Sequence, residues 1–164
     1  MTKSEMRLRV IIAVTETTPV ARLWETALRL LRETPADLAA LYLQDDRWYR
    51  VASLPFTREI LRRGGIPVDF TQQRAEQVSR ERAARVREAI GKLAAESKLE
   101  PVFESLSETD AARLRKFIGS RENIFVAPSF ISTRPIFSML SEMNCRIELV
   151  EAEEEQERPA YTLP

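Results

Sequence analysis

Short apolar runs alternate along this chain with segments whose apolar residues recur at the period of a helix. Leu8 to Val14 is a nearly continuous run rich in β-branched side chains, which is typical of a strand buried on both faces of a parallel sheet. Apolar residues then recur every three or four positions as far as Leu31, and Thr18 followed by Pro19 predicts the start of this helix, with Thr18 as its cap. Asp37 to Leu43 is strand-like again. The three elements form a β-α-β unit, for which a right-handed crossover is expected.

The same alternation continues beyond residue 70. A long helix is predicted from Thr71 to about Leu99, because apolar residues line one face while glutamates lie four positions before basic residues on the other. A strand from Pro101 to Leu106 follows. Ser107, with Asp110 three residues later, resembles a capping box, so we expect Ser107 to cap the next helix, which ends near Gly119.

Two further strands and a short helix complete the pattern. Asn123 to Ala127 is the fourth strand, Pro135 opens a helix, and Arg146 to Val150 is the last strand. The last strand alternates charged and apolar residues, which is typical of a strand at an edge or with one face in water. The predicted fold class is α/β: a doubly wound (Rossmann-like) five-stranded parallel sheet with helices on both faces. We expect residues 1–151 to form this single domain and the acidic residues 152–164 to be a mobile tail.

The segment Gln44 to Phe70 follows neither period. Its aromatic side chains suit three roles: a lid over a ligand, a surface that meets a partner, or ordinary core packed on the sheet. Asp45 and Asp46 would lie at the carboxyl edge of the sheet, where two acids could bind a metal or act as acid and base. Neighbouring acids are common in loops, however, and no third ligand accompanies them.

The composition removes several classes of function. The 164 residues include 25 basic and 25 acidic side chains, so no overall charge attracts nucleic acid or an anionic membrane. Histidine, the commonest metal ligand and general base, is missing. Cys145 is the single cysteine, and we expect it to be a small buried hydrophobe. Because there is neither a bilayer-length apolar run nor a signal-like N-terminus, we expect a cytoplasmic protein.

Several stretches resemble the universal stress protein family, and the resemblance covers almost the whole chain. The carriers are the opening strand VIIAVTET, the helix PVARLWETALRLLRE, the strand DLAALYL and the run LEPVFESLSETDAARLRKFIGSRENIFVA. In that family the last of these leads into a G-x-x-G-x9-G-S/T motif that binds ATP phosphates. With NIFVA as the anchor, the three glycine positions fall on Ala127, Phe130 and Leu140, and the final hydroxyl falls on Ser141. No glycine of the motif is present.

The same segment also lacks what any phosphate loop requires. Such a loop brings several backbone N–H groups together and keeps side chains small enough for the phosphate to approach. Pro128 and Pro135 each remove a donor, and Phe130 and Ile131 add bulk. The resemblance therefore implies the fold of the family without ATP binding in the family manner.

Polar side chains nevertheless gather at the expected carboxyl ends of the first and fourth strands, where open α/β sheets bind ligands. The family often has an acidic residue after its first strand, placed to meet adenosine; here a threonine stands there, next to a glutamate. A small anion could bind among these groups, or Ser132 or Thr133 could simply cap the helix opened by Pro135. The candidate cofactor-binding residues are Thr15, Glu16, Ser129, Ser132, Thr133 and Arg134.

The function expected is that of a non-catalytic regulatory or interaction domain of the stress response, with no cofactor and no metal. The resemblance implies a homodimer, often through the last strand, so we expect Arg146 to Val150 to pair with its symmetry mate. A separate protein partner also suits such a domain, whereas nucleic acid binding and membrane insertion are not expected. Two alternatives stay open: an ATP-binding member with an altered phosphate loop, and a sensor that holds a small ligand in the same cleft.

Overall fold

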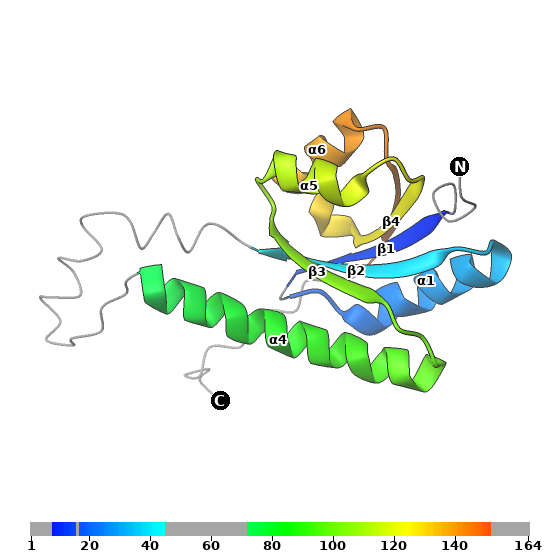
Figure 1. Cartoon of the computed structure of the whole chain (residues 1–164), viewed down its shortest axis with the longest axis horizontal. Helices are drawn as coiled ribbons and strands as arrows, with labels where there is room; N and C mark the ends of the chain where they lie inside the picture. The colour runs from blue at the N-terminus through cyan, green and yellow to red at the C-terminus, as the bar shows by residue number, and fades with distance from the viewer. Residues whose placement is uncertain (1–7, 16, 45–71, 152–164) are drawn as a thin grey trace, which may run out of the picture.

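A computed structural model describes residues 8–15, 17–44 and 72–151, and within them one parallel sheet carries helices on both faces (Figure 1). The strands are β1 (Arg9–Val14), β2 (Asp37–Gln44), β3 (Val102–Ser107), β4 (Asn123–Pro128) and β5 (Arg146–Val150). The helices are α1 (Val20–Glu33), α4 (Gln72–Ser97), α5 (Ala111–Ile118) and α6 (Pro135–Glu142), with the 3₁₀-helix η1 (Ser129–Thr133) before α6. Each predicted strand is confirmed to within about two residues, the usual uncertainty of an element's end.

The strand order is β3-β2-β1-β4-β5, and every neighbouring pair is parallel. The order reverses between β1 and β4, so the sheet is doubly wound, as predicted. β1 pairs with β2 as far as Val14 opposite Tyr42, but its pairing with β4 ends at Ile12 opposite Val126. The two central strands therefore separate toward their carboxyl ends, where such a sheet has its ligand crevice.

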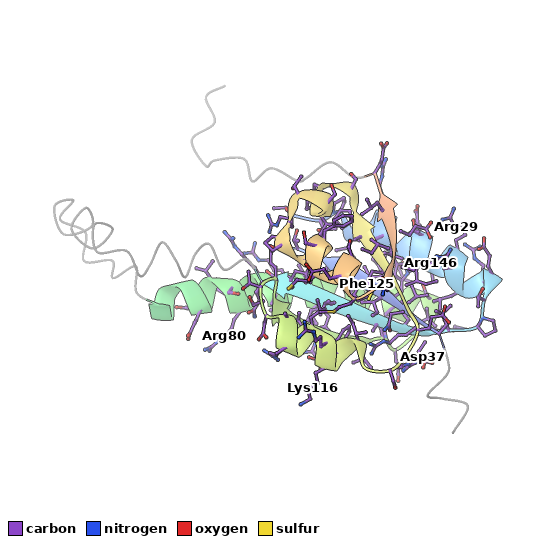
Figure 2. All side chains as sticks on the ribbon, turned by 90° about the horizontal axis from the view of Figure 1, so that it is seen from above. Arg29, Asp37, Arg80, Lys116, Phe125 and Arg146 are labelled. Carbon is purple, nitrogen blue, oxygen red and sulfur yellow. The ribbon has the colours of Figure 1, made fainter. Side chains whose placement is uncertain are left out.

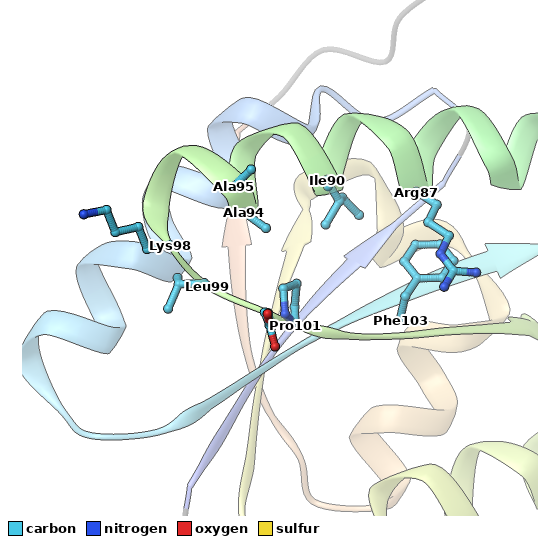
Figure 3. A pocket seen from close by; sticks show the side chains of 10 residues that line it. Arg87, Ile90, Ala94, Ala95, Lys98, Leu99, Pro101 and Phe103 are labelled. Atoms are coloured by element: carbon cyan, nitrogen blue, oxygen red, sulfur yellow. The ribbon is translucent and has the colours of Figure 1, made fainter.

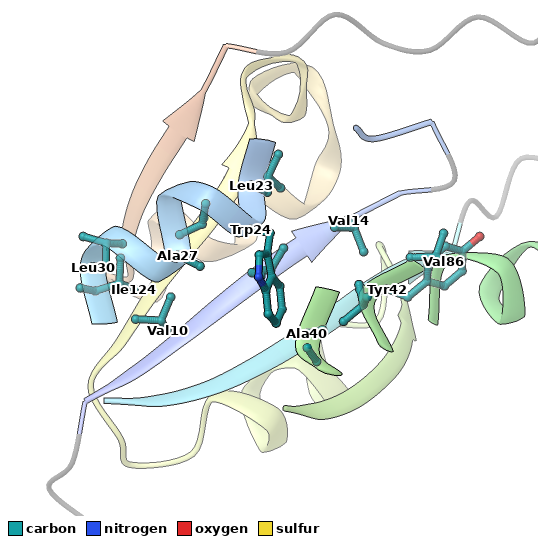
Figure 4. Close-up of a cluster of buried hydrophobic side chains, with 14 residues drawn as sticks. Val10, Val14, Leu23, Trp24, Ala27, Leu30, Ala40, Tyr42, Val86 and Ile124 are labelled. Atoms are coloured by element: carbon teal, nitrogen blue, oxygen red, sulfur yellow. The ribbon is translucent and has the colours of Figure 1, made fainter. Parts of the chain in front are cut away.

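Helices α1 and α4 cover one face of the sheet, and their buried side chains pack against alternate residues of β1, β2 and β4 (Figure 4). Trp24 of α1 is almost wholly buried, and its Nε1 donates to the Ser97 hydroxyl at the end of α4, 3.2 Å away. Val86 and Ile90 bring the middle of α4 into the same cluster. Burial of a side chain as large as that of Trp24 contributes about 3 kcal/mol to folding.

Helices α5 and α6 cover the opposite face. Leu114 of α5 and Ile136 of α6 pack with Phe125, which lies at the centre of the molecule in Figure 2, whereas Lys116 of α5 lies at its rim. Cys145 is half-buried and packs against this cluster, and burial raises the pKa of its thiol. The thiol is thus a packing group of the second core, although a less buried one than expected.

The two edge strands are β3 and β5. The prediction that the last strand lies at an edge is confirmed. Each edge exposes one large apolar side chain: Val102 on β3 is 62% exposed and Leu149 on β5 is 42% exposed. Strand edges and exposed apolar side chains together are features through which proteins associate.

Helix α4 runs beside the sheet and extends past it (Figure 1). Its exposed face carries two of the predicted ion pairs, Glu76 with Arg80 at 3.5 Å and Glu88 with Lys92 at 3.8 Å. Exposed pairs four residues apart contribute about 0.3–0.5 kcal/mol each. Arg80 and Lys92 therefore lie on a solvated face of the helix, as predicted.

The predicted caps of two helices are wrong. Thr18 does not cap α1: its Oγ1 accepts a hydrogen bond from the backbone N–H of Thr15 at 2.9 Å, and the helix begins two residues later, at Val20. Ser107 is the last residue of β3, and α5 is capped by Asp110. In both places the hydroxyl could bond to more than one backbone group, and in the structure it bonds within the turn that follows the strand.

Some predictions fall on residues outside the described part of the chain. These are Glu16, the pair Asp45 and Asp46, most of the aromatic segment that ends at Phe70, and the tail 152–164. Among the described residues, no helix combines the length and the apolar character needed to cross a membrane.

Candidate functional site

The carboxyl ends of β1 and β4 bring together five of the six predicted site residues. Thr15 follows β1, while Ser129, Ser132 and Thr133 lie in η1, directly after β4. Arg134 stands between η1 and α6. These residues lie at one edge of the sheet because β1 and β4 are parallel neighbours, and the carboxyl ends of parallel strands meet at the same edge.

The hydroxyl groups after β1 are bonded to one another. The Oγ1 atoms of Thr15 and Thr18 are 2.9 Å apart, and both residues are buried. Thr17 donates its backbone N–H to Thr15 Oγ1 at 3.3 Å. These bonds close a turn at the carboxyl end of β1. Thr15 is therefore a structural group of that turn, with its hydroxyl and its N–H both engaged.

The hydroxyl groups of η1 turn back onto the backbone of η1. Ser132 Oγ donates to the carbonyl of Ser129 at 3.0 Å, and Thr133 Oγ1 donates to the carbonyl of Phe130 at 2.9 Å. The predicted capping of α6 by Ser132 or Thr133 is wrong, because the residue at the cap position is Arg134 and no side chain accepts from the helix there. Pro135, at the first helical position, needs no acceptor.

Arg134, which is partly buried, forms an ion pair with the buried Glu108, a residue that sequence reasoning did not single out. Arg134 Nε donates to Glu108 Oε1 at 2.9 Å and to Oε2 at 3.2 Å, and Arg134 Nη2 also contacts Oε1. The side chains are 17% and 6% exposed. Glu108 is held after β3 by its backbone N–H, which donates to the carbonyl of Gln44 at 3.3 Å. The ion pair thus joins the end of the β2–β3 pair to the start of α6.

No signal in the sequence identifies Glu108. It lies 26 residues before Arg134, and in the sequence it is one of several polar residues that precede a helix. Only the fold brings the two together, since β3 and β4 are separated in the sheet by β2 and β1.

The segment after β4 is the 3₁₀-helix η1, which is held against the core. Ile131 is buried in the core under α6, so the segment is anchored to the sheet by an apolar side chain. The N–H of Arg134 donates to the carbonyl of Ile131 at 2.9 Å, and the N–H of Phe137 donates to the carbonyl of Arg134 at 3.1 Å. A phosphate cradle needs such donors pointing outward and converging. The N–H groups of Arg134 and Phe137 are instead used within η1 and the first turn of α6.

A shallow groove lies away from this edge, between the last turns of α4 and the start of β3 (Figure 3). Its volume is about 880 Å³. Ile90, Ala94 and Leu99 form an apolar wall, and the Arg87 guanidinium lies over the ring of Phe103, 5.4 Å from its centre. Within the described ranges, no group of three or more acidic or cysteine side chains could hold a metal ion.

Comparison with known proteins finds similar chains among solved structures. No family model matches the sequence, and no curated protein matches it. Among solved structures, the chain is similar to a protein from the universal stress protein family from Burkholderia pseudomallei. The two are 14% identical, the match covers 93% of this chain and 100% of that chain, and the TM-score is 0.46. This is the family whose sequence features the chain resembles.

Proposed function

We propose that this chain is a regulatory or interaction domain of the stress-response type that has no catalytic activity and does not bind ATP in the family manner. The observation that carries the proposal is the buried pair between Glu108 and Arg134 at the carboxyl edge of the sheet. Arg134 is the cation among the predicted site residues, and its charge is already neutralised there.

A polyphosphate at this edge would have to compete with the Glu108 carboxylate. Separating the partners of a buried ion pair costs about 3–5 kcal/mol. Because each 1.4 kcal/mol is tenfold in affinity, that cost weakens binding by at least about 100-fold. A carboxylate left at the site would also repel the phosphates. The hydroxyl groups of Ser132 and Thr133 already donate to carbonyls of η1, so a phosphate would also have to replace these bonds.

Calorimetric titration with ATP and magnesium tests this proposal. We expect no saturable heat at millimolar nucleotide. Saturable binding at micromolar ATP would overturn it in favour of a nucleotide-binding domain with an altered loop. Such binding should then weaken in Thr133→Val, which leaves the Glu108–Arg134 pair intact, and stay unchanged in Ser138→Ala, on the exposed side of α6. A small ligand held in the cleft would instead appear as added mass in native mass spectrometry.

We further propose that the domain forms a homodimer through β5. The outer edge of this strand is open within the described structure, and Leu149 on it is exposed. Glu148 pairs with Arg29 of α1 at 2.6 Å, so its charge at the strand's centre is partly balanced. An antiparallel pairing of two β5 strands would continue the sheet across a two-fold axis.

Sedimentation velocity at micromolar concentration tests the dimer. We expect Leu149→Glu to shift the protein to a monomer. Val102→Glu is the matched control, because it places the same charge on the exposed apolar residue of the other edge strand. A monomeric unmodified protein would contradict the dimer, and dissociation by Val102→Glu alone would move the interface to β3.

A further inference from the structure

A second hollow lies on the other face of β3 from the groove of Figure 3, between β3 and α5. We call it the α5–β3 hollow; its volume is about 380 Å³. Arg9 lines it from the start of β1, and Arg113 and Lys116 line it from α5. Arg113 and Lys116 are three residues apart on one side of the helix, which is why they reach the same space. Three cations therefore border one small hollow.

The floor of the α5–β3 hollow is partly apolar. Val102, Glu104 and Leu106 lie on the same face of β3, because alternate residues of a strand point the same way, so one carboxylate stands between the two apolar side chains. Phe117 of α5 completes the floor. Val102 is 62% exposed, and α5, which has 8 residues, leaves it uncovered. Exposed apolar surface beside cations suits a ligand that has both a charged and a hydrocarbon part.

Arg9 is held in place as a binding group rather than as a mobile surface cation. Its Nε donates to Asn123 Oδ1 at 2.9 Å, Nη2 donates to the carbonyl of Phe117 at 2.5 Å, and the guanidinium lies 4.4 Å from the centre of the Phe117 ring. Two of its five N–H groups are used in these bonds. The guanidinium is thus oriented while keeping donors for a ligand, which limits the entropy lost on binding.

The charges around the α5–β3 hollow are not balanced. Its acidic group is Glu104, which is exposed on β3. In the described part of the chain, neither Arg113 nor Lys116 forms an ion pair. Burial lowers the pKa of the Arg9 guanidinium, and the neighbouring Arg121 lowers it further, while Asp37 acts in the opposite direction. An anion in the hollow would lie beside three cations, Arg9, Arg113 and Lys116, and one carboxylate.

We propose that the α5–β3 hollow binds a small organic carboxylate, with the carboxylate against Arg9, Arg113 and Lys116 and the hydrocarbon part on Val102 and Phe117. A carboxylate matches the planar fork of an oriented guanidinium. A volume of about 380 Å³ lies at the low end of ligand sites and suits a single ring or a short chain. The site is separate from the carboxyl edge of the sheet, so the ATP titration does not bear on it.

Benzoate, benzamide and inorganic phosphate are the probes that test this proposal, in titrations followed by amide chemical shifts. We expect benzoate to saturate, with shifts in α5 and β3, and to bind about tenfold more tightly than benzamide, which has the same ring without the charge. Phosphate, which has the charge without the ring, should bind more weakly than benzoate.

Variants on α5 separate a built site from general attraction. Arg113→Gln and Lys116→Gln should each weaken benzoate binding by about three- to tenfold. Arg115→Gln removes the same charge from the same helix outside the hollow and should leave binding unchanged. These residues are exposed, so the variants should fold, as far-ultraviolet circular dichroism can verify. Absence of saturation, equal binding of benzamide or phosphate, or an equal loss in Arg115→Gln would overturn the proposal.

Discussion

Arg134→Met should destabilise the domain more than any exposed charge substitution. Methionine keeps much of the apolar stem, so the change mainly removes the guanidinium and its contacts with both carboxylate oxygens of Glu108. The carboxylate left behind has a side chain only 6% exposed. Breaking a buried pair from one side costs about 3–5 kcal/mol, and we expect about 3 kcal/mol because Arg134 itself is near the surface.

A double-mutant cycle makes the prediction specific. Glu108→Leu should cost about 1–2 kcal/mol, because the Arg134 guanidinium can turn toward water. The double variant should cost less than the sum of the two, with an interaction energy above about 1 kcal/mol. Urea unfolding followed by circular dichroism measures all three free energies. In a domain of this size, about 3 kcal/mol lowers the midpoint of thermal unfolding by about 6–12 °C.

The pair between Arg29 and Glu148 is the control. It has a similar N–O distance, 2.6 Å, but its side chains are 57% and 29% exposed. Arg29→Met should therefore cost less than about 1 kcal/mol. If Arg134→Met cost no more than Arg29→Met, or if the two single changes were additive, the Glu108–Arg134 pair would not be a desolvated pair. Arg134 could then exchange Glu108 for a phosphate at little cost, which would contradict the proposed lack of ATP binding.

Three further predictions test local features. Asp110→Ala should cost about 1 kcal/mol in urea unfolding, because Asp110 Oδ1 caps α5, whereas Ser107→Ala should cost less; equal costs would contradict the assigned cap. Gly119→Ala should cost about 1 kcal/mol or more, because Gly119 has a φ of 59°, and a neutral effect would show that this conformation relaxes. Burial raises the pKa of the Cys145 thiol above its ordinary value, so the contribution of the neutral thiol to stability is complete below the unfolded pKa and is lost as pH rises through the folded pKa. The pH midpoint of iodoacetamide alkylation should accordingly be higher in the folded protein than in urea, and equal midpoints would contradict it.

The sheet could be predicted from the sequence because its signals are local. In a run such as Leu8 to Val14 the five residues after Arg9 are all apolar, so no alternate set of polar side chains can face water, which indicates a strand covered on both faces. The alternation in Arg146–Val150 predicted an edge strand for the same reason. Once strands and helices alternate, handedness and short connections leave few ways to order them.

Hydrogen-bond partners were predicted less well than elements. Thr18, Ser107 and Thr133 each stand near a helix start, and each was expected to cap it or named as a candidate cap. In the structure each hydroxyl bonds within its own turn. Serine and threonine can satisfy several nearby backbone groups at similar cost, so tertiary packing decides which one is chosen. The local sequence does not contain that information.

The distribution of charge separates the two candidate sites of this domain. At the carboxyl edge, the cation among the predicted site residues, Arg134, is paired with the buried Glu108. In the α5–β3 hollow, three cations stand beside a floor that holds Val102, Leu106 and a single exposed acid, Glu104. A cation that already has a desolvated partner must lose that interaction before it binds an anion, whereas a cation in water gives up much weaker interactions. Ligands of α/β sheets usually bind in the crevice at the carboxyl edge, but that position alone does not predict where this domain would bind an anion. Anion binding depends on which cations the fold leaves without a buried carboxylate partner.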